Sequence, residues 1–347
     1  MPRYRYQVQR FSPSNTPITP PNAFNITFET ASTTKSIPLA TGDWATHPAF
    51  TFGTTELNGI WVGKFETSYG NVANSVNETK YSDVYIKPNQ YSLTNQSLSN
   101  QFLTAQDVWT QHNLTALTDT RMMRNDDWGA VTYLTTSAYG IGANEVWVNN
   151  ANVNNFTIAG RAGNSVGAGS YTYPDLATAI ADTANTNPYY NAIGPNASST
   201  GNVYGVYDMS GGAWENTLSN YNKSVGSSGF STGAATAFAA NGTDIPDKYF
   251  NFYMNPPFTG SQYTDYNLCI WSTCGGQALY ETTTVASVSG DFQSWFGSLS
   301  LFVSAGWPGS VRGGGFSSGS SSGLFANGQS VGVGYSYFGF RMVQSKF

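Results

Sequence analysis

The stretch NVYGVYDMSGGAWEN, Asn202 to Asn216, constrains the fold more than any other part of the sequence. Its glycine pair, Gly211 and Gly212, permits a backbone turn at positive φ, which residues with side chains rarely adopt. Met209 and Trp214 supply large apolar surfaces that can hold such a turn against a core. We therefore expect a structural turn here. Its predicted scaffold residues are Asp208, Gly211, Trp214 and Glu215.

Two shorter motifs near the end of the sequence carry arginines. They are VRGGGF, from Val311, and FGFRMV, from Phe338. A guanidinium has five donors in a fixed plane, so it can bridge loop carbonyls and carboxylates such as Asp208 or Glu215. The motifs therefore predict further structural positions. These are Arg312, Gly313, Gly314, Phe340 and Arg341.

The composition excludes some classes of protein. Of the 347 residues, 40% are hydrophobic and 15% aromatic, which is too apolar for a disordered chain. Only 10% are charged and the net charge is -5, so the sequence lacks the basic surface that nucleic acid requires. We expect a neutral surface of Asn, Ser, Thr, Gly and Tyr, as is common on secreted and virion proteins, and no membrane insertion.

The pattern along the chain is that of a loop-rich α+β protein. Residues 59–67 and 144–150 combine β-branched and aromatic residues between Gly and Asn, which predicts strands. Residues 103–115 and 127–140 carry apolar side chains three and four positions apart, which predicts helices, and a further helical turn is expected within 209–218.

The first forty residues differ from the rest. RYRYQVQRF alternates in the manner of a strand, and a Pro- and Thr-rich connector, SPSNTPITPPN, follows it. We predict an N-terminal attachment arm and linker over residues 1–40 and a ligand-binding domain over 41–347. The alternative, left open, is that the first segment adds a strand to the main domain.

Cysteines and histidines are few. Cys269 and Cys274 match neither a CxxC pair nor half of a zinc site, and we favour buried free thiols over a small local disulfide. His47 and His112 are expected to be ordinary core or loop residues. The sequence contains no D-x-D-x-D-G run, which is the pattern that would indicate a calcium site.

Four motifs in order resemble the formylglycine-generating-enzyme (sulfatase-modifying factor) domain, a variant of the C-type-lectin fold. NVYGVYDMSGGAWEN is similar to its N-x-x-G-L-x-D-M-x-G-N-V-W-E-W signature, and VRGGGF and FGFRMV to its terminal RGG and GFR landmarks. GIWVGKFETS and RNDDWGAVTYLTTSAYG resemble its early strand and its helix. The resemblance implies a C-type-lectin fold over most of the chain.

The same resemblance argues against the family's redox chemistry. Copper-dependent members carry a cysteine pair after RGG, whereas GFSSGSSSGLFANGQ contains none. Iron-dependent relatives need a cluster of histidines, and this chain has two in all. We expect no catalytic residue, no metal and no cofactor.

A non-catalytic branch is closer: the ligand-binding variable proteins of diversity-generating retroelements. GQALYET from Gly276, WPGSVRGG from Trp307 and the closing GFR resemble the layout of that branch. It implies a variable region at about 307–341 whose backbone displays small polar and aromatic side chains outward. The predicted ligand-binding residues are Phe316, Ser317, Ser318, Ser320, Ser321, Asn327, Gln329, Ser330, Val333, Tyr335, Ser336 and Tyr337.

These points predict a receptor-binding protein or adhesin, at a phage tail-fibre tip or on a cell surface. Its expected partners are a host cell-surface protein or glycan, other virion proteins through residues 1–40, and further copies of itself, with a trimer favoured. The alternative is a divergent enzyme on the same fold, such as a carbohydrate hydrolase with a carboxylate pair or a sulfatase-modifying-like enzyme.

Overall fold

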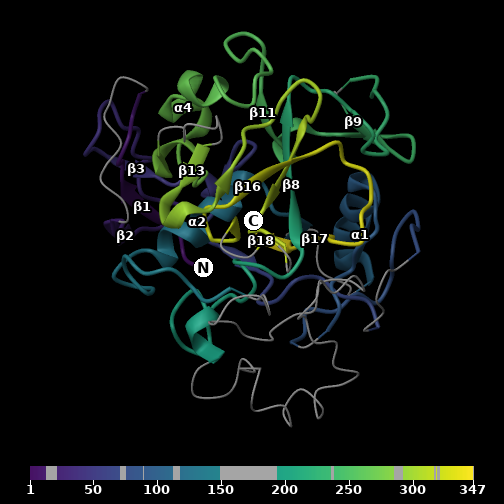
Figure 1. Cartoon of the computed structure of the whole chain (residues 1–347), viewed down its shortest axis with the longest axis horizontal. Coiled ribbons are helices and arrows are strands. Elements are labelled where there is room, and N and C mark those ends of the chain that lie inside the picture. The colour runs from purple at the N-terminus through teal and green to yellow at the C-terminus, as the bar shows by residue number, and fades with distance from the viewer. Residues whose placement is uncertain are drawn as a thin grey trace.

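The computed structural model describes most of the chain. The described ranges are 1–12, 22–70, 76–88, 90–111, 118–148, 194–235, 238–284, 292–315, 318 and 321–346. They form a mixed α+β fold that is rich in sheet, has few helices and contains a curled sheet resembling half of a barrel (Figure 1). The predicted α+β class is thereby confirmed.

The curled sheet has eight strands, in the order β11-β8-β15-β16-β14-β13-β12 with β17 also on β8. Strand β8 crosses the middle of the molecule, with β15 along one side and with β17 and β11 sharing the other (Figure 1). The strands are β8 (Trp214–Tyr221), β11 (Asn251–Tyr253), β12 (Thr283–Thr284), β13 (Phe292–Ser294), β14 (Leu299–Ser300), β15 (Gly309–Arg312), β16 (Asn327–Ser330) and β17 (Phe338–Phe340).

Smaller sheets surround this one. Two have three strands, in the orders β2-β1-β3 and β6-β18-β7, and the pairs β4-β5 and β9-β10 are hairpins. Their strands are β1 (Tyr4–Gln7), β2 (Ile26–Phe28), β3 (Trp44–Thr46), β4 (Thr51–Phe52), β5 (Thr55–Glu56), β6 (Ile60–Val62), β7 (Thr118–Met122), β9 (Phe238–Ala240), β10 (Thr243–Ile245) and β18 (Met342–Lys346).

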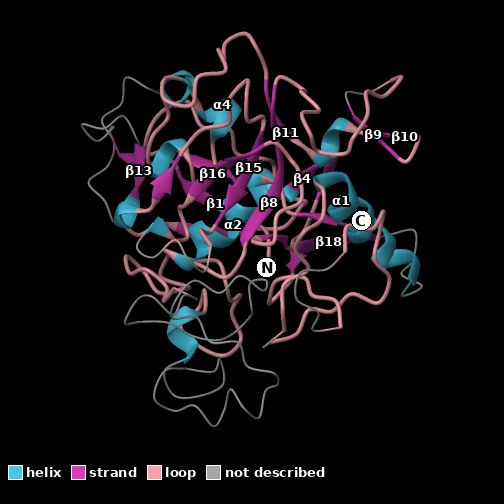
Figure 2. Ribbon diagram, turned by 45° about the vertical axis from the view of Figure 1, so that its right-hand side comes forward, coloured by secondary structure: helices cyan, strands magenta, loops and turns pink. Residues whose placement is uncertain are grey.

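Helices are short and lie among long loops (Figure 2). The helices α1 (Leu98–Gln111) and α2 (Asn125–Thr135) confirm the two predicted from apolar spacing, and α1 packs against β7. The other helices of the described ranges are α4 (Trp271–Cys274) and the 3-10 helices η1 (Pro48–Phe50), η2 (Gly194–Ala197), η3 (Asp247–Tyr249), η4 (Asp265–Leu268), η5 (Tyr280–Thr282) and η6 (Trp295–Gly297).

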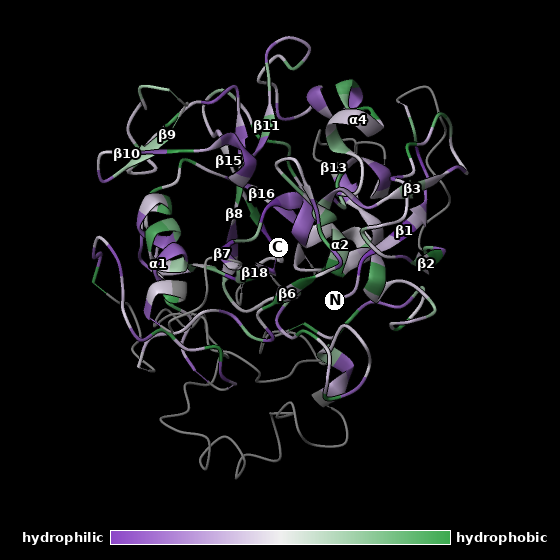
Figure 3. Ribbon diagram, turned by 180° about the vertical axis from the view of Figure 1, so that it is seen from behind, coloured by the Kyte–Doolittle hydropathy of each residue, from purple (hydrophilic) through white to green (hydrophobic). Residues whose placement is uncertain are grey.

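Helix α2 is almost wholly buried, although its first turn is acidic. Asp127 accepts a hydrogen bond from the Arg124 backbone N–H at 2.9 Å and pairs with the Arg121 guanidinium at 2.8 Å. These contacts cap the helix and offset the cost of burying the carboxylate. Hydrophobic residues recur along α1 and α2 (Figure 3), where they join one continuous core.

The N-terminal strand belongs to that core. The Tyr4 hydroxyl donates to the Ala130 carbonyl at 2.7 Å, and the Tyr6 ring lies 5.1 Å from that of Tyr133. Strand β1 therefore adds to the body of the molecule, which is the alternative that the sequence left open. The sheet β2-β1-β3 spans the proposed boundary at residue 40. An attachment role for residues 1–40 stays a prediction.

Three local predictions are wrong. Cys269 and Cys274 form a disulfide, because the turn of α4 brings their Cα atoms to 5.6 Å. The expected helical turn within 209–218 is instead strand β8, since Gly211 and Gly212 adopt φ of 81° and 74° just before it. Residues 144–148, the described part of the predicted strand, form no strand.

No helix in the described ranges is both long enough and apolar enough to cross a bilayer.

Candidate ligand-binding surface

The segment Ser310 to Val343 forms four strands separated by two loops. Strands β15, β16 and β17 lie in the curled sheet, and β18 is the middle strand of β6-β18-β7. The segment is therefore anchored in two sheets. Side chains that are exposed or half-buried lie at Ser318 and Ser321, between β15 and β16, and in the loop 331–337 after β16.

Arg341 holds this base together, as the sequence predicted. Its guanidinium donates to both carboxylate oxygens of Glu215, at 2.6 and 3.1 Å, and to the carbonyls of Gly63 and Tyr207, each at 2.8 Å. Arg341 and Glu215 are both buried. The ion pair thus joins Arg341, between β17 and β18, to Glu215 on β8, and the two carbonyl bonds join it to Gly63 and Tyr207.

Glu66 is a member of this cluster that the sequence reasoning missed. One oxygen accepts the Ala213 N–H at 2.9 Å, and the other accepts the Ser92 hydroxyl. Burial, followed by the charges of Glu215 and Asp208, raises the pKa of Glu66 well above its usual value. The one feature of the sequence that could have indicated a role for Glu66 is its position in the motif GIWVGKFETS, and the spacing of residues in that motif does not assign it one.

Arg312 has a different environment. Its guanidinium donates to the carbonyls of Ala278 at 2.9 Å and Gln277 at 3.3 Å and lies 5.6 Å from the centre of the Trp128 ring. Burial lowers the pKa of Arg312 to about 10. No ion pair of Arg312 occurs in the described ranges, so it bridges loop carbonyls as predicted but not a carboxylate.

The glycines of VRGGGF are required by the backbone. Gly313 and Gly314 have φ of 85° and 81°, and a Cβ at Gly314 would lie 2.4 Å from Ser322 Cα. A side chain at either position would be strained. The turn after β15 therefore depends on glycine, as expected. Of the other predicted scaffold residues, Asp208 and Phe340 are buried and Trp214 is half-buried.

The twelve predicted ligand-binding residues do not share one environment. Tyr337 is 37% exposed and Ser321 is also exposed. The half-buried residues are Ser318, Gln329, Val333, Tyr335 and Ser336. Phe316, Ser317 and Ser320 lie outside the described residues.

For Asn327 and Ser330 the predicted outward orientation is wrong. Both are 1% exposed, because β16 lies inside the curled sheet between β15 and β14. The Asn327 amide accepts from the Ser310 hydroxyl at 2.6 Å and donates to the Leu301 carbonyl. Gln329, two residues on, donates to the Phe302 carbonyl. This part of the segment supports the sheet.

The loop 331–337 contains the best-formed part of the surface. The rings of Tyr335 and Tyr337 are parallel to within 10°, with centroids 5.2 Å apart, and Phe338 packs edge-on against both. Main-chain bonds fix the loop: Tyr335 O accepts from Asn95 N at 2.8 Å, and Tyr337 O accepts from Trp214 N at 2.9 Å. The two tyrosines are therefore pre-organised. Burial, followed by the neighbouring Tyr335, raises the pKa of Tyr337.

A second, smaller element adjoins Trp214. The Ser318 N–H donates to Gly315 O at 2.9 Å, and the Ser318 hydroxyl accepts from Gly315 N at 3.0 Å. A Cβ at Gly315 would lie 2.8 Å from the Trp214 ring, so this glycine permits close approach of the turn to the indole. The Trp214 ring thus supports the turn at Gly315, and the Trp214 main-chain N–H supports the loop 331–337.

His47 is a core residue. His47 is buried, its Nδ1 accepts from Ala49 N at 3.2 Å, and burial lowers its pKa to about 3. His112 lies outside the described residues. Within the described ranges, no three His, Cys, Asp or Glu side chains are grouped so that they could hold a metal ion.

No protein-family model matches the sequence, and the comparison with curated proteins gave no match.

Proposed function

We propose that the protein is a non-catalytic receptor-binding protein that uses the loop 331–337 and the adjoining turn at residue 318 to contact a ligand. The observation that carries this proposal is the parallel pair Tyr335 and Tyr337 on a base fixed by main-chain bonds. Tyrosine offers a large contact area for little loss of side-chain entropy, and interface energy concentrates in a few such aromatic anchors.

The proposal includes a C-type-lectin fold of the formylglycine-generating-enzyme type, similar to the variable proteins of diversity-generating retroelements. The supporting features are the glycine turn after β15 and the Arg341–Glu215 pair beneath the terminal strands. On this proposal the surface is that of a virion tail-fibre tip or a cell-surface adhesin, the partner is a host protein or glycan, and a trimer is the favoured assembly.

Three buried carboxylates near these motifs are engaged in structural contacts. Glu215 pairs with Arg341, and Asp127 pairs with Arg121. Asp126 accepts from Asn251 Nδ2 at 2.8 Å and is buried. These contacts favour binding over hydrolysis as the function of this surface.

The test is binding to candidate host cells by the wild type, Tyr335→Ala and Tyr337→Ala. Each truncation is expected to weaken binding by about 1–3 kcal/mol, roughly 5- to 150-fold, with circular dichroism unchanged. Tyr139→Ala, which removes an exposed tyrosine of another loop, is the matched control. Wild-type affinity in both Tyr335→Ala and Tyr337→Ala would refute the proposal.

A further inference from the structure

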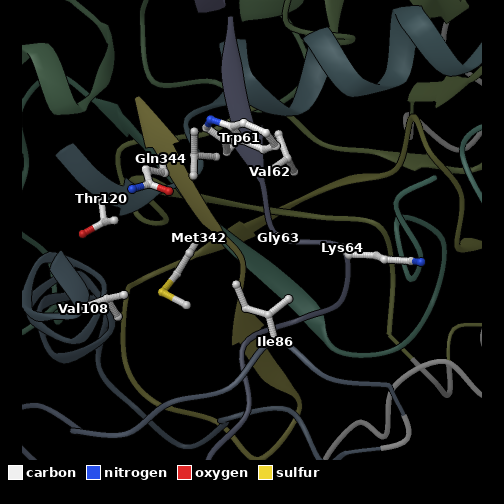
Figure 4. Close-up of a pocket in the computed structure, with 10 residues that line it drawn as sticks. Trp61, Val62, Gly63, Lys64, Ile86, Val108, Thr120, Met342 and Gln344 are labelled. Atoms are coloured by element: carbon white, nitrogen blue, oxygen red, sulfur yellow. The ribbon is translucent and has the colours of Figure 1, made fainter. Parts of the chain in front are cut away.

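Trp61 is an exposed aromatic residue at the edge of a sheet. It lies on β6, the outer strand of β6-β18-β7, and is 69% exposed. Figure 4 shows its indole beside Gln344, which is its partner across the ladder with β18. Folded proteins usually bury so large an apolar surface, and exposed apolar surfaces often mark binding sites.

Two hollows adjoin this indole. The first has a volume of about 260 Å³ and is mainly apolar, with the side chains of Ile86, Val108 and Met342 around it (Figure 4). The second has about 680 Å³. The residues lining the second are Met1, Pro2, Asn58, Gly59, Ile60, Trp61 and Lys346. Trp61 lines both, so one ligand could cover the indole and extend to either side.

Polar groups flank the indole on both sides. Gln344 makes no side-chain hydrogen bond within the described part of the chain, and Asn58 uses its Oδ1 to accept from Ala31 N at 2.8 Å. The hydroxyl of Thr120, which lines the first hollow, is buried and has no hydrogen-bond partner among the described residues; the residue is 4% exposed. Amide groups beside one aromatic face suit a ligand with both apolar faces and hydroxyls.

The ionisable side chains among the described residues that line the two hollows are basic, whereas the whole chain is acidic. Their ionisable side chains, among the described lining residues, are Lys64 and Lys346, and none is acidic. Lys64 donates to the Val203 carbonyl and Lys346 is exposed. Figure 4 shows the Lys64 amine directed away from the indole, so the exposed Lys346 supplies the positive charge beside Trp61 on a chain whose net charge is -5. That positive charge favours an anionic ligand.

We propose that β6 carries a second binding site, for an acidic oligosaccharide. One sugar ring stacks on the Trp61 indole, Gln344 and Asn58 donate to its hydroxyls, and the carboxylate of an acidic sugar lies toward Lys346. The site is independent of the tyrosine pair in loop 331–337. The hydroxyl-binding amides favour a sugar over an apolar side chain of a protein partner, and Lys346 favours an acidic sugar over a neutral one.

The experiment is titration of the full chain with 3′-sialyllactose, a hyaluronan tetrasaccharide and an oligogalacturonate, followed by indole fluorescence and calorimetry. Lactose and maltotriose are the neutral counterparts. We expect at least one acidic probe to bind more tightly than either neutral sugar, and its binding to weaken as salt rises. Trp61→Ala should weaken binding about tenfold or more, and Lys346→Gln about two- to fivefold.

Two controls separate this site from other surfaces. Trp307→Ala removes another exposed indole, 46% exposed, and should leave sugar binding unchanged. Tyr335→Ala and Tyr337→Ala should also leave it unchanged, so a failure of the proposed receptor surface is distinguishable from a failure here. Absence of binding by all three acidic probes, equal binding of neutral sugars, or full affinity in Trp61→Ala would each overturn the proposal.

Discussion

Around Arg341, three buried carboxyl groups meet one buried guanidinium. Glu215 takes the bidentate contact, Glu66 is held by Ala213 N and Ser92, and Asp208 is also buried. Such a cluster is stable only while every member keeps its partners, because an uncompensated charge in the core is costly.

Arg341→Ala is therefore expected to lower the free energy of unfolding by about 3–5 kcal/mol, since it leaves the Glu215 carboxylate buried without its counter-ion. Urea unfolding measures the change. Arg312→Ala removes hydrogen bonds to two carbonyls but breaks no ion pair, and a smaller loss, about 1–3 kcal/mol, is expected. Unchanged midpoints in both variants would show that the arginines are not structural.

Glu281 makes stability depend on pH. The hydroxyls of Tyr133 and Tyr6 donate to it at 2.6 and 3.1 Å, Gly276 N donates at 2.8 Å, and burial raises its pKa to about 7. Because the folded-state pKa exceeds the unfolded value of 4.5, the folded protein binds the proton more tightly. The resulting stabilisation is full below about pH 4.5 and is lost as the pH rises through about 7.

Glu281→Gln isolates this contribution. Between about pH 5 and pH 7 the wild type should lose roughly 2 kcal/mol more of unfolding free energy than the variant. The measurement is urea unfolding of both proteins across that range. Parallel pH profiles would mean that Glu281 does not titrate there.

At the scale of elements, β16 and the loop after it divide the C-terminal segment into a supporting part and a displayed part. Asn327 on β16 bonds to Ser310 and Leu301 from within the sheet. Ser336 lies in the loop 331–337 and is half-buried. Small polar residues therefore support the sheet in β16 and are available for contact with a ligand in the loop 331–337.

Asn327→Ala should lower the unfolding free energy by about 1–3 kcal/mol, because it leaves the Leu301 carbonyl and the buried Ser310 hydroxyl without their partner. Ser336→Ala should change it by less than about 0.5 kcal/mol. Thermal and urea unfolding of the two variants test the division. Equal losses in both would contradict it.

For the whole molecule, the proposed ligand-binding surface, which is the loop 331–337 with the adjoining turn at residue 318, should tolerate substitutions at its exposed positions without loss of the fold. Joint replacement of Ser321, Ser336 and Tyr337 by other polar residues is expected to shift stability by under about 0.5 kcal/mol per position. Receptor binding should fall sharply, since Tyr337 is one of the two proposed anchors. Circular dichroism measures folding and cell binding measures receptor affinity, both on the same samples. An unfolded variant, or one that binds as well as wild type, would count against the receptor surface.

The sequence alone determined the local features of this protein. Positive φ at Gly211 and Gly212, the two helices with apolar spacing, and the strand character of residues 4–7 each follow from preferences of a few neighbouring residues. The structural roles of Arg312 and Arg341 were also predictable, because a guanidinium in so uncharged a chain needs several acceptors.

Only the tertiary structure decided which polar residues are buried and which partners they hydrogen-bond. Asn327 and Ser336 look alike in sequence, but the neighbours of β16 cover one and leave the other half-buried. Glu66 and Glu281 meet partners far along the chain, and short-range periodicity carries no information about such contacts. The exposure of Trp61 has the same origin: strand pattern predicted β6, whereas sheet order placed it at an edge.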